Sequence, residues 1–235
     1  MATIAVTHLE RPTYGMGQVD QLLRLNSGTA RRWIDGYDRG GKEYRPVVRP
    51  ARTDEPLVTW GEFVECGFLA QYRSAGVPLI NLRPVVDRLR DELGVRYPLA
   101  HKRLYVAGRD LVERVQTETD LDGELAIVVR TGQVMADADG LRPLALSPSA
   151  QEFFDAARWG DTDGDAYVAQ LAAPGSGGEV VFDPRRSFGS PTVAGIRTDV
   201  IAEEVGAGSD ADVVAKGFGI TPEQVTAAVR YEHAA

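Results

Sequence analysis

The fold of this 235-residue chain is decided first by one stretch, Asn26-Ser27-Gly28-Thr29-Ala30-Arg31-Arg32-Trp33-Ile34-Asp35-Gly36-Tyr37. Its apolar side chains recur at the spacing i, i+3, i+4 and i+7, which predicts a helix with one buried face. Asparagine and serine favour the start of a helix and glycine tolerates a turn, so the helix should begin at about residue 29. The residues expected on the buried face are Ala30, Trp33, Ile34 and Tyr37.

A second short helix should precede this stretch. Residues 18–25 place Val19, Leu22 and Leu23 on one helical face. Two short helices joined by a turn that contains glycine form a helix-turn-helix, and we expect one over residues 15–44. Gly40-Gly41 then leads into residues 44–49, a strand-like piece that would form a wing beside the second helix.

The outer face of the second helix carries the candidates for contact with DNA. With the apolar face inward, Thr29, Arg31, Arg32 and Asp35 should point outward near the helix start, where a recognition helix meets base edges and phosphates. Arg31 or Arg32 could donate two hydrogen bonds to guanine. Basic residues of the wing would contact phosphates or the minor groove. The predicted DNA-binding residues are therefore Thr29, Arg31, Arg32, Arg39, Lys42, Arg45 and Arg49.

Charge is distributed unevenly along the chain, whose net charge is −8. Residues 1–116 carry 18 lysines and arginines against 14 acids, whereas residues 117–235 carry 8 against 20. A basic first half can bind a polyanion even in an acidic protein, because the footprint on nucleic acid is local. The acidic second half suits a basic protein partner or no partner. A basic helical face that is merely solvated, or that contacts a protein, is the alternative interpretation of the first half.

A second helical block should follow the wing. Thr59 and Glu62 have the spacing of a capping box and should open a helix that runs to about Ser74. The single cysteine, Cys66, lies in the apolar pattern of this helix and should be buried. Asn81 is expected to cap a further helix that ends at Gly94. Its buried face should consist of Leu82, Val85, Val86, Leu89 and Leu93.

The middle of the chain has a weaker pattern. Residues 125–130 predict a strand, residues 141–146 allow another, and residues 149–154 allow a short helix. The stretches 161–165 and 174–178, rich in aspartate and glycine, are expected to be loops.

The C-terminal part is again well patterned. Residues 180–182 and a piece around Val193 should pair as a hairpin. Three helices should follow, over residues 199–205, after Ser209, and after a capping box that begins at Thr221. Acidic residues on the last two helices would repel a phosphate backbone. This unit therefore suits dimerisation or a basic protein partner, or contributes stability alone.

These elements predict a mainly α fold with short β elements (α+β). Residues 1–114 would form a winged helix-turn-helix domain, residues 115–178 a middle segment of short strands and loops, and residues 179–235 a hairpin followed by three helices. No window approaches the apolar length of a membrane span, and residues 1–6 lack the pattern of a signal peptide. With one cysteine and no possible internal disulfide, we expect a cytoplasmic protein that contacts no membrane.

Signatures of enzymes are missing from the sequence. There is no phosphate-binding glycine loop, no dinucleotide fingerprint, and no zinc-binding pair of histidines or cysteines. The three histidines, His8, His101 and His233, stand far apart. We therefore expect no enzyme, no catalytic residues, no metal and no cofactor.

Two parts of the chain resemble known families. Residues 14–50, including Gly28-Thr29-Ala30-Arg31-Arg32-Trp33-Ile34-Asp35-Gly36-Tyr37, resemble the winged helix-turn-helix of MerR-type regulators, and residues 63–89 are similar to the helices that follow it. The motifs Phe182-Asp183-Pro184 and Ala194-Gly195-Ile196-Arg197-Thr198 resemble a small domain of unknown function, often encoded beside a PIN-domain nuclease toxin. The whole arrangement is similar to VapB-type antitoxins of type II toxin–antitoxin pairs.

This resemblance implies a homodimeric antitoxin that silences a cognate PIN-domain ribonuclease toxin. It also implies that the protein represses its own operon by binding double-stranded operator DNA. It assigns no toxin-binding segment, because residues 115–178 carry no motif of the family. The alternative is a stand-alone MerR-like transcriptional regulator that responds to a small molecule through a pocket in the middle segment, although the chain lacks the coiled coil and ligand residues of MerR effector sites.

Overall fold

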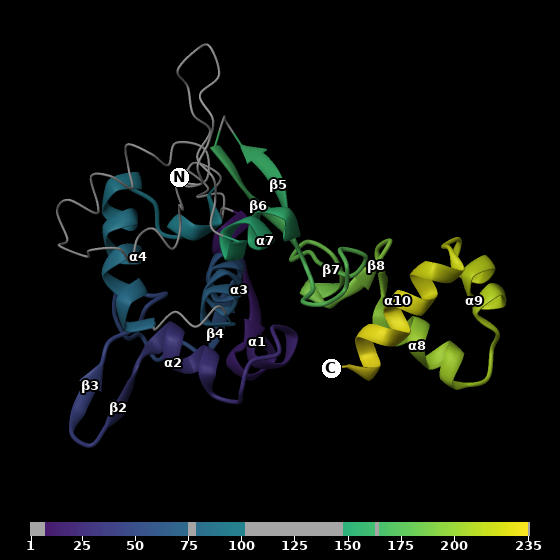
Figure 1. The fold of residues 1–235 in the computed structure, drawn as a ribbon, viewed down its shortest axis with the longest axis horizontal. Coiled ribbons are helices and arrows are strands. Elements are labelled where there is room, and N and C mark those ends of the chain that lie inside the picture. Colours follow the sequence, from purple (N-terminus) through teal and green to yellow (C-terminus); the bar gives the residue numbers. More distant parts are fainter. Residues whose placement is uncertain (1–7, 75–78, 102–147, 163–164, 235) are drawn as a thin grey trace, which may run out of the picture.

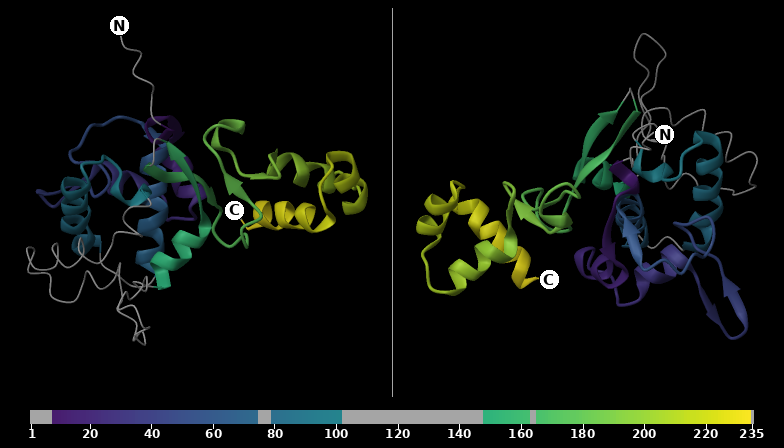
Figure 2. Two further views of the ribbon diagram at one scale, coloured as in Figure 1. Left: turned by 90° about the horizontal axis from the view of Figure 1, so that it is seen from above. Right: turned by 180° about the vertical axis from the view of Figure 1, so that it is seen from behind.

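The computed structural model describes residues 8–74, 79–101, 148–162 and 165–234. Helices and short antiparallel sheets form a larger N-terminal lobe, and three helices form a smaller C-terminal lobe at the other end of the molecule (Figure 1). The short strands β7 and β8 lie between the two lobes in all three views (Figures 1 and 2). The predicted α+β class is confirmed.

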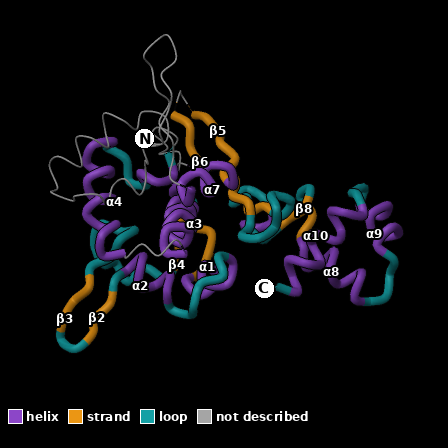
Figure 3. The backbone as a smooth tube through the Cα atoms, in the orientation of Figure 1, coloured by secondary structure: helices purple, strands orange, loops and turns teal. Residues whose placement is uncertain are grey.

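The first half of the N-terminal lobe contains the predicted pair of helices. The helices α1 (Met16–Leu22) and α2 (Thr29–Asp35) are joined by a short turn. A hairpin of β2 (Tyr37–Arg39) and β3 (Lys42–Tyr44) follows directly and extends away from the lobe (Figure 3). Before and after this unit, η1 (His8–Glu10), β1 (Pro12–Gly15) and β4 (Leu57–Thr59) complete the segment, with β1 and β4 paired antiparallel.

The helix α3 (Trp60–Ser74) is the centre of this lobe. Eleven of its residues are buried, including Cys66 as predicted. The capping box is also confirmed, because the Thr59 N–H donates to Glu62 Oε2 at 2.9 Å and the Glu62 N–H donates to Thr59 Oγ1 at 3.3 Å. A helix covered on all sides reads as apolar around its whole circumference, which explains the run from Phe63 to Leu69.

The helix α4 (Leu79–Leu93) packs its predicted apolar face inward, and a short η2 (Pro98–Ala100) follows. Leu82, Val85, Val86 and Leu89 are buried. The prediction that Asn81 caps this helix is wrong, because the helix begins at Leu79 and Asn81 lies inside its first turn.

A five-stranded antiparallel sheet links the two lobes. After α7 (Pro148–Ala156), its strands run in the order β5 (Ala157–Thr162), β6 (Asp165–Ala172), β7 (Val181–Phe182), β8 (Thr192–Val193) and β9 (Ile196–Arg197). The predicted hairpin of β7 and β8 is confirmed. The sheet spans the boundary expected at residues 178 and 179, since β6 pairs with β7.

The expected loop over residues 161–165 is wrong at its described residues. Asp161 pairs with Ala166 and Thr162 pairs with Asp165 in the ladder of β5 and β6. These polar residues stay paired because the register of β5 and β6 is fixed elsewhere in the ladder, where Val168 and Leu171 of β6 are buried. The strands expected over residues 125–130 and 141–146 lie outside the described residues.

The C-terminal lobe contains the three expected helices, α8 (Thr198–Gly206), α9 (Ala211–Phe218) and α10 (Pro222–His233). The capping box at Thr221 is confirmed, with Gln224 as its partner. The residue at the start of α9 is Asp210, one residue after the expected Ser209. Within the described part of the chain, no helix is long and apolar enough to cross a membrane.

Tyr14 and Gly189 join the N-terminal lobe to the segment that leads into the C-terminal helices. The Tyr14 hydroxyl donates to the Gly189 carbonyl oxygen at 2.7 Å, and the tyrosine ring is buried. Gly189 has a φ of 77°, and a Cβ atom there would lie 2.5 Å from Tyr14 Oη. Only glycine therefore fits this contact without displacing the tyrosine.

We expect Gly189→Ala to lower the free energy of unfolding by more than the roughly 1–3 kcal/mol that a positive φ costs a residue other than glycine. The matched control is Gly219→Ala, at a φ of 70° with no atom within 4 Å of the added Cβ. Urea denaturation of both variants separates the backbone strain, common to both, from the clash with Tyr14. Equal losses in the two variants would show that this contact does not hold the lobes together.

Candidate nucleic-acid interface

The helix α2 is oriented by a carboxylate from the neighbouring helix. Asp20 of α1 is buried, and its two oxygens accept hydrogen bonds at 2.7 Å from the N–H groups of Gly28 and Ala30. The residue before α2 is Gly28, in the left-handed region with a φ of 77°, and it has no side chain to cap the helix. Asp20 therefore supplies the cap that the sequence assigned to Asn26 and Ser27, and it fixes the angle between α1 and α2.

The outward face of α2 is narrower than predicted. Arg31 and Arg32 are exposed, as expected. Arg32 donates to the Gly28 carbonyl at 3.0 Å and to Thr29 Oγ1 at 3.3 Å, so its guanidinium lies back along the helix start. The expected exposure of Thr29 and Asp35 is wrong, because both side chains are buried.

The wing lies earlier in the chain than predicted. It consists of β2 and β3 with Gly40-Gly41 at the tip, both at positive φ as a two-residue hairpin turn requires, whereas residues 44–49 were expected. Gly36 makes the connection from α2 possible, because a Cβ there would lie 2.4 Å from the Tyr44 carbonyl oxygen.

Alternation along the hairpin separates its charges onto two faces. Arg39 is opposite Lys42, and Tyr37 is opposite Tyr44, so these four share one face. The two tyrosine rings stack with centroids 4.7 Å apart, and the Lys42 ammonium lies over the Tyr44 ring. Asp38 and Glu43 form the other pair, on the opposite face, where Asp38 binds Arg52 at 2.9 Å. The wing therefore has one cationic, aromatic face.

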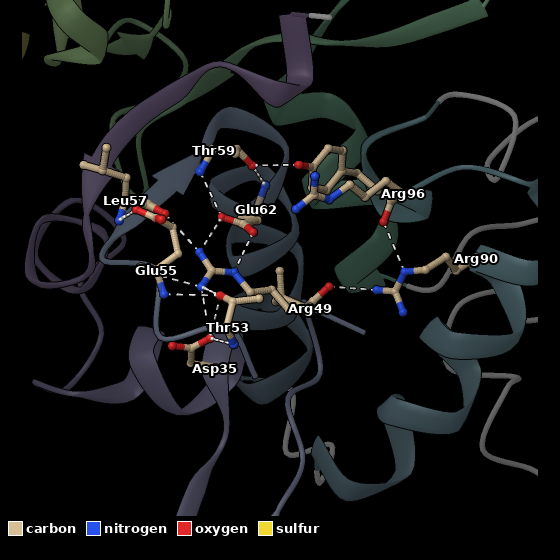
Figure 4. Close-up of polar contacts among 11 residues, drawn as sticks. Asp35, Arg49, Thr53, Glu55, Leu57, Thr59, Glu62, Arg90 and Arg96 are labelled. Atoms are coloured by element: carbon tan, nitrogen blue, oxygen red, sulfur yellow. Dashed lines mark hydrogen bonds and ion pairs between the residues drawn. The ribbon is translucent and has the colours of Figure 1, made fainter. Parts of the chain in front are cut away.

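The expected exposure of Arg49 is also wrong. Its side chain is 3% exposed and lies between Asp35 at 3.0 Å and Glu62 at 2.8 Å (Figure 4). The same guanidinium donates to Thr53 Oγ1 and to the carbonyl oxygens of Glu55 and Leu57. A buried charge needs such complete pairing. The sequence alone does not reveal that Arg49, the last residue of the basic run, is buried.

The pairing has opposite effects on the pKa values of the two partners. Burial alone would lower the pKa of Arg49, but its hydrogen bonds with Glu62 and Asp35 outweigh burial and raise it. Burial alone would raise the pKa of Asp35, but hydrogen bonds from the Thr53 backbone and from Arg49 outweigh it and hold that pKa below its ordinary value. Asp35 and Arg49 are therefore both charged at neutral pH.

A hollow of about 290 Å³ lies between α2, the wing and two later helices. Trp33 and the stacked pair Tyr37 and Tyr44 form its apolar walls. Three guanidinium groups line it, those of Arg32, Arg73 and Arg83, and no carboxylate belongs to its described lining. Such a hollow suits a phosphate group, since guanidinium groups bind phosphate oxygens with paired hydrogen bonds.

Arg73 and Arg83 are the residues that sequence reasoning missed. They lie 29 and 39 residues after Tyr44, the last residue of the wing, on α3 and α4, and no local pattern links them to it. Arg83 donates to the carbonyl oxygens of Arg45 and Pro46, and Arg90 donates to that of Val48 at 2.8 Å (Figure 4). The segment after the wing is therefore held by two arginines of α4.

The structure thus divides the seven predicted residues into two groups. The side chains of Arg31, Arg32, Arg39, Lys42 and Arg45 are exposed on α2 and the hairpin segment. Thr29 and Arg49 are buried and hold that region together. Among the described residues, no group of three or more histidine, cysteine or acidic side chains could hold a metal ion.

Comparisons with known proteins cover both the C-terminal part and the whole chain. Residues 180–231 match a family described as a protein of unknown function, DUF433. Over its length the chain is 36% identical to Rv2308 of Mycobacterium tuberculosis, described as uncharacterized, with 98% of this chain and 94% of that protein aligned. The chain belongs to the Rv2308 family.

Two further proteins of the same organism resemble this Rv2308-family chain. One, described as the putative antitoxin VapB45, is 26% identical, and the alignment covers 91% of each chain. The other is Rv2018, whose X-ray crystal structure superposes with a TM-score of 0.72 at 23% identity, over 94% of this chain and 99% of that one. The likeness to Rv2018 shows that the fold of the Rv2308-family chain also occurs in a crystal structure.

For the Rv2308-family chain we expect Arg49→Met to lower the free energy of unfolding at neutral pH by about 3–5 kcal/mol, because two buried carboxylates lose their counter-charge. Because the folded pKa of Asp35 lies below its unfolded value, its stabilising effect is present above about pH 4 and is lost as pH falls through the folded pKa. The difference in the free energy of unfolding between wild type and variant should therefore become smaller below about pH 4. Urea denaturation across pH measures this.

Arg52→Met is the matched control for this variant. Arg52 also bridges two carboxylates, those of Asp38 and Asp54, but on the exposed surface. Its replacement should change stability little, since water screens exposed pairs. If wild type and the Arg49 variant kept a constant gap at every pH, the buried pairing would not account for the loss.

Proposed function

We propose that this protein is a DNA-binding antitoxin that neutralises a cognate PIN-domain ribonuclease and represses its own operon. The observation that carries the DNA-binding part is the cationic face shared by α2, the wing and the hollow between them. Arg32, Arg39 and Lys42 lie on elements that meet at the stacked tyrosines, and Arg73 and Arg83 extend the same charge. A recognition helix beside a basic wing matches the geometry with which winged helix-turn-helix proteins enter the major groove and grip the flanking phosphates.

The acidic C-terminal lobe favours a separate partner. Asp210, Asp212 and Glu223 are exposed at the starts of α9 and α10, where they suit a basic protein surface better than a phosphate backbone. The relative described as a putative antitoxin aligns along nearly the whole chain, and this supports a toxin as that partner. A homodimer would place two copies of α2 on half-sites one or two helical turns apart.

The DNA-binding part is tested by Arg31→Ala combined with Arg32→Ala. We expect at least a tenfold loss of affinity for duplex DNA from upstream of the gene, because two exposed cations leave the recognition helix. If both contact phosphates, the slope of log K against log salt should fall by about 1.8. Fluorescence anisotropy at several salt concentrations measures both quantities.

The control for charge is Lys216→Ala combined with Arg230→Ala. These two exposed cations lie on α9 and α10, away from the cationic face, so their removal should leave the affinity unchanged. Equal losses in the two double variants would mean that total charge, and not the α2 face, governs binding.

The antitoxin part is tested by co-expression with the product of the adjacent reading frame. We expect this protein to rescue growth that the neighbour inhibits and to co-purify with it. The Arg31→Ala, Arg32→Ala variant should rescue equally well, because its changes lie on the DNA-facing helix. Failure of the wild type to rescue or co-purify would overturn the antitoxin assignment and leave the DNA-binding part to be judged by anisotropy alone.

A further inference from the structure

A cavity of about 660 Å³ opens between parts of the chain that are distant in sequence. It lies among the turn that joins α1 to α2, the C-terminal half of α3, the helix α7, and the turn that joins β6 to β7. Leu23, Ala70, Phe153 and Leu171 line it with apolar surface, and three of these four are buried. Its size falls within the range of roughly 300–1,000 Å³ that is typical of small-molecule sites.

Three glycines line part of the cavity. Gly175, Gly177 and Gly178 all have positive φ and belong to the turn after β6. A residue with a side chain would be strained at these positions. At these three positions the turn therefore lines the cavity with backbone and no side chain.

The polar groups at the cavity favour an anion. Two guanidinium groups, those of Arg24 and Arg73, line it together with the amides of Asn26 and Gln71. Within the described lining the carboxylate is that of Asp155, and its Oδ1 already accepts a hydrogen bond from Gln151 at 2.7 Å. Apolar walls with an excess of positive charge in the described lining suit an organic molecule that carries one acidic group on an apolar body.

Arg73 lines both this cavity and the smaller hollow between α2 and the wing. Its guanidinium carbon lies 6.0 Å from the centre of the Trp33 ring on α2, the distance of a cation–π contact. An anion in the cavity competes with that contact and with DNA phosphate for the same cation. Arg24 is shared in a similar way, because it lies 5.6 Å from the Tyr231 ring of α10 and also lines the cavity.

We propose that the cavity binds a small organic anion with an apolar body, and that this binding draws Arg73 away from the DNA-facing surface. Ligand and DNA then weaken each other's binding by the same factor, as linkage requires. The binding step stands on the cavity alone, whereas the effect on DNA rests on the proposed function. Because one cation is shared, we expect each ligand to lower the affinity for the other by about fivefold, the lower end of common allosteric couplings.

Two fluorescent dyes test the binding step. Anilinonaphthalene sulfonate carries an anionic group on an aromatic body, and N-phenyl-1-naphthylamine is its uncharged counterpart. Titration of the full-length protein should show one anilinonaphthalene sulfonate per chain. Arg73→Gln and Arg24→Gln should each lower the affinity for the anionic dye at least fivefold. The affinity for the neutral dye should not change, because only a positive charge of the lining is removed.

Two more variants locate the dye. Ala70→Trp fills the cavity from α3 and should abolish the binding of both dyes, with near-ultraviolet circular dichroism as the check that the fold is retained. Arg230→Gln removes an exposed cation of α10 and should leave the binding of both dyes unchanged. The binding proposal is overturned if the wild type binds no dye, if both dyes respond alike to Arg73→Gln, or if a folded Ala70→Trp protein still binds.

The effect on DNA is measured separately by anisotropy with duplex DNA from upstream of the gene. Saturating anilinonaphthalene sulfonate should lower the DNA affinity of the wild type about fivefold and should leave the DNA affinity of the Arg73→Gln variant unchanged. An unchanged DNA affinity in the presence of bound dye would overturn the coupling. A wild type that binds dye but no DNA would overturn the proposed function and, with it, the coupling, while the cavity would remain assigned as an anion site.

Discussion

The position of α2 and of the wing depends on one buried guanidinium, that of Arg49. It binds Asp35 at the end of α2 and Glu62 in the first turn of α3, and it holds the intervening chain through the carbonyl of Leu57 (Figure 4). Because Glu62 is also the partner of Thr59 in the capping box, one set of contacts ends α2, returns the chain from the wing and starts the central helix. Desolvating three charges is tolerable only when all are paired, so these elements keep one arrangement.

Contacts of Tyr14 and Arg24 join the N-terminal lobe to the C-terminal part of the chain. Tyr14 of β1 donates to Gly189, in the segment that leads into the C-terminal helices, and Arg24 of the turn between α1 and α2 lies over Tyr231 of α10. The turn that positions α2 thus also borders the large cavity and contacts α10. The helix α2, the cavity and the C-terminal helices therefore meet at one short segment, and the coupling proposed above would pass through it.

Local patterns predicted the local structure well. The helical spacing of Ala30, Trp33 and Ile34 and the capping boxes at Thr59 and Thr221 gave helices that the structure contains. Contacts distant in sequence were not predictable in this way. An aspartate such as Asp20 has no local sign that it will cap the next helix, and the last arginine of a basic run looks the same whether it faces solvent or two buried acids. Arg73 and Arg83 reach the hollow beside α2 and the wing only through the packing of α3 and α4.

The five-stranded sheet has a consequence for how the gene can vary. Its strands come from both sides of the boundary drawn from sequence, so a cut at that boundary would divide one sheet between two pieces. A chain cut between β6 and β7 would expose the unpaired edge of β6, and an open edge is a template for aggregation. Substitutions on the outer faces of the C-terminal helices, by contrast, would vary that surface and leave the sheet whole.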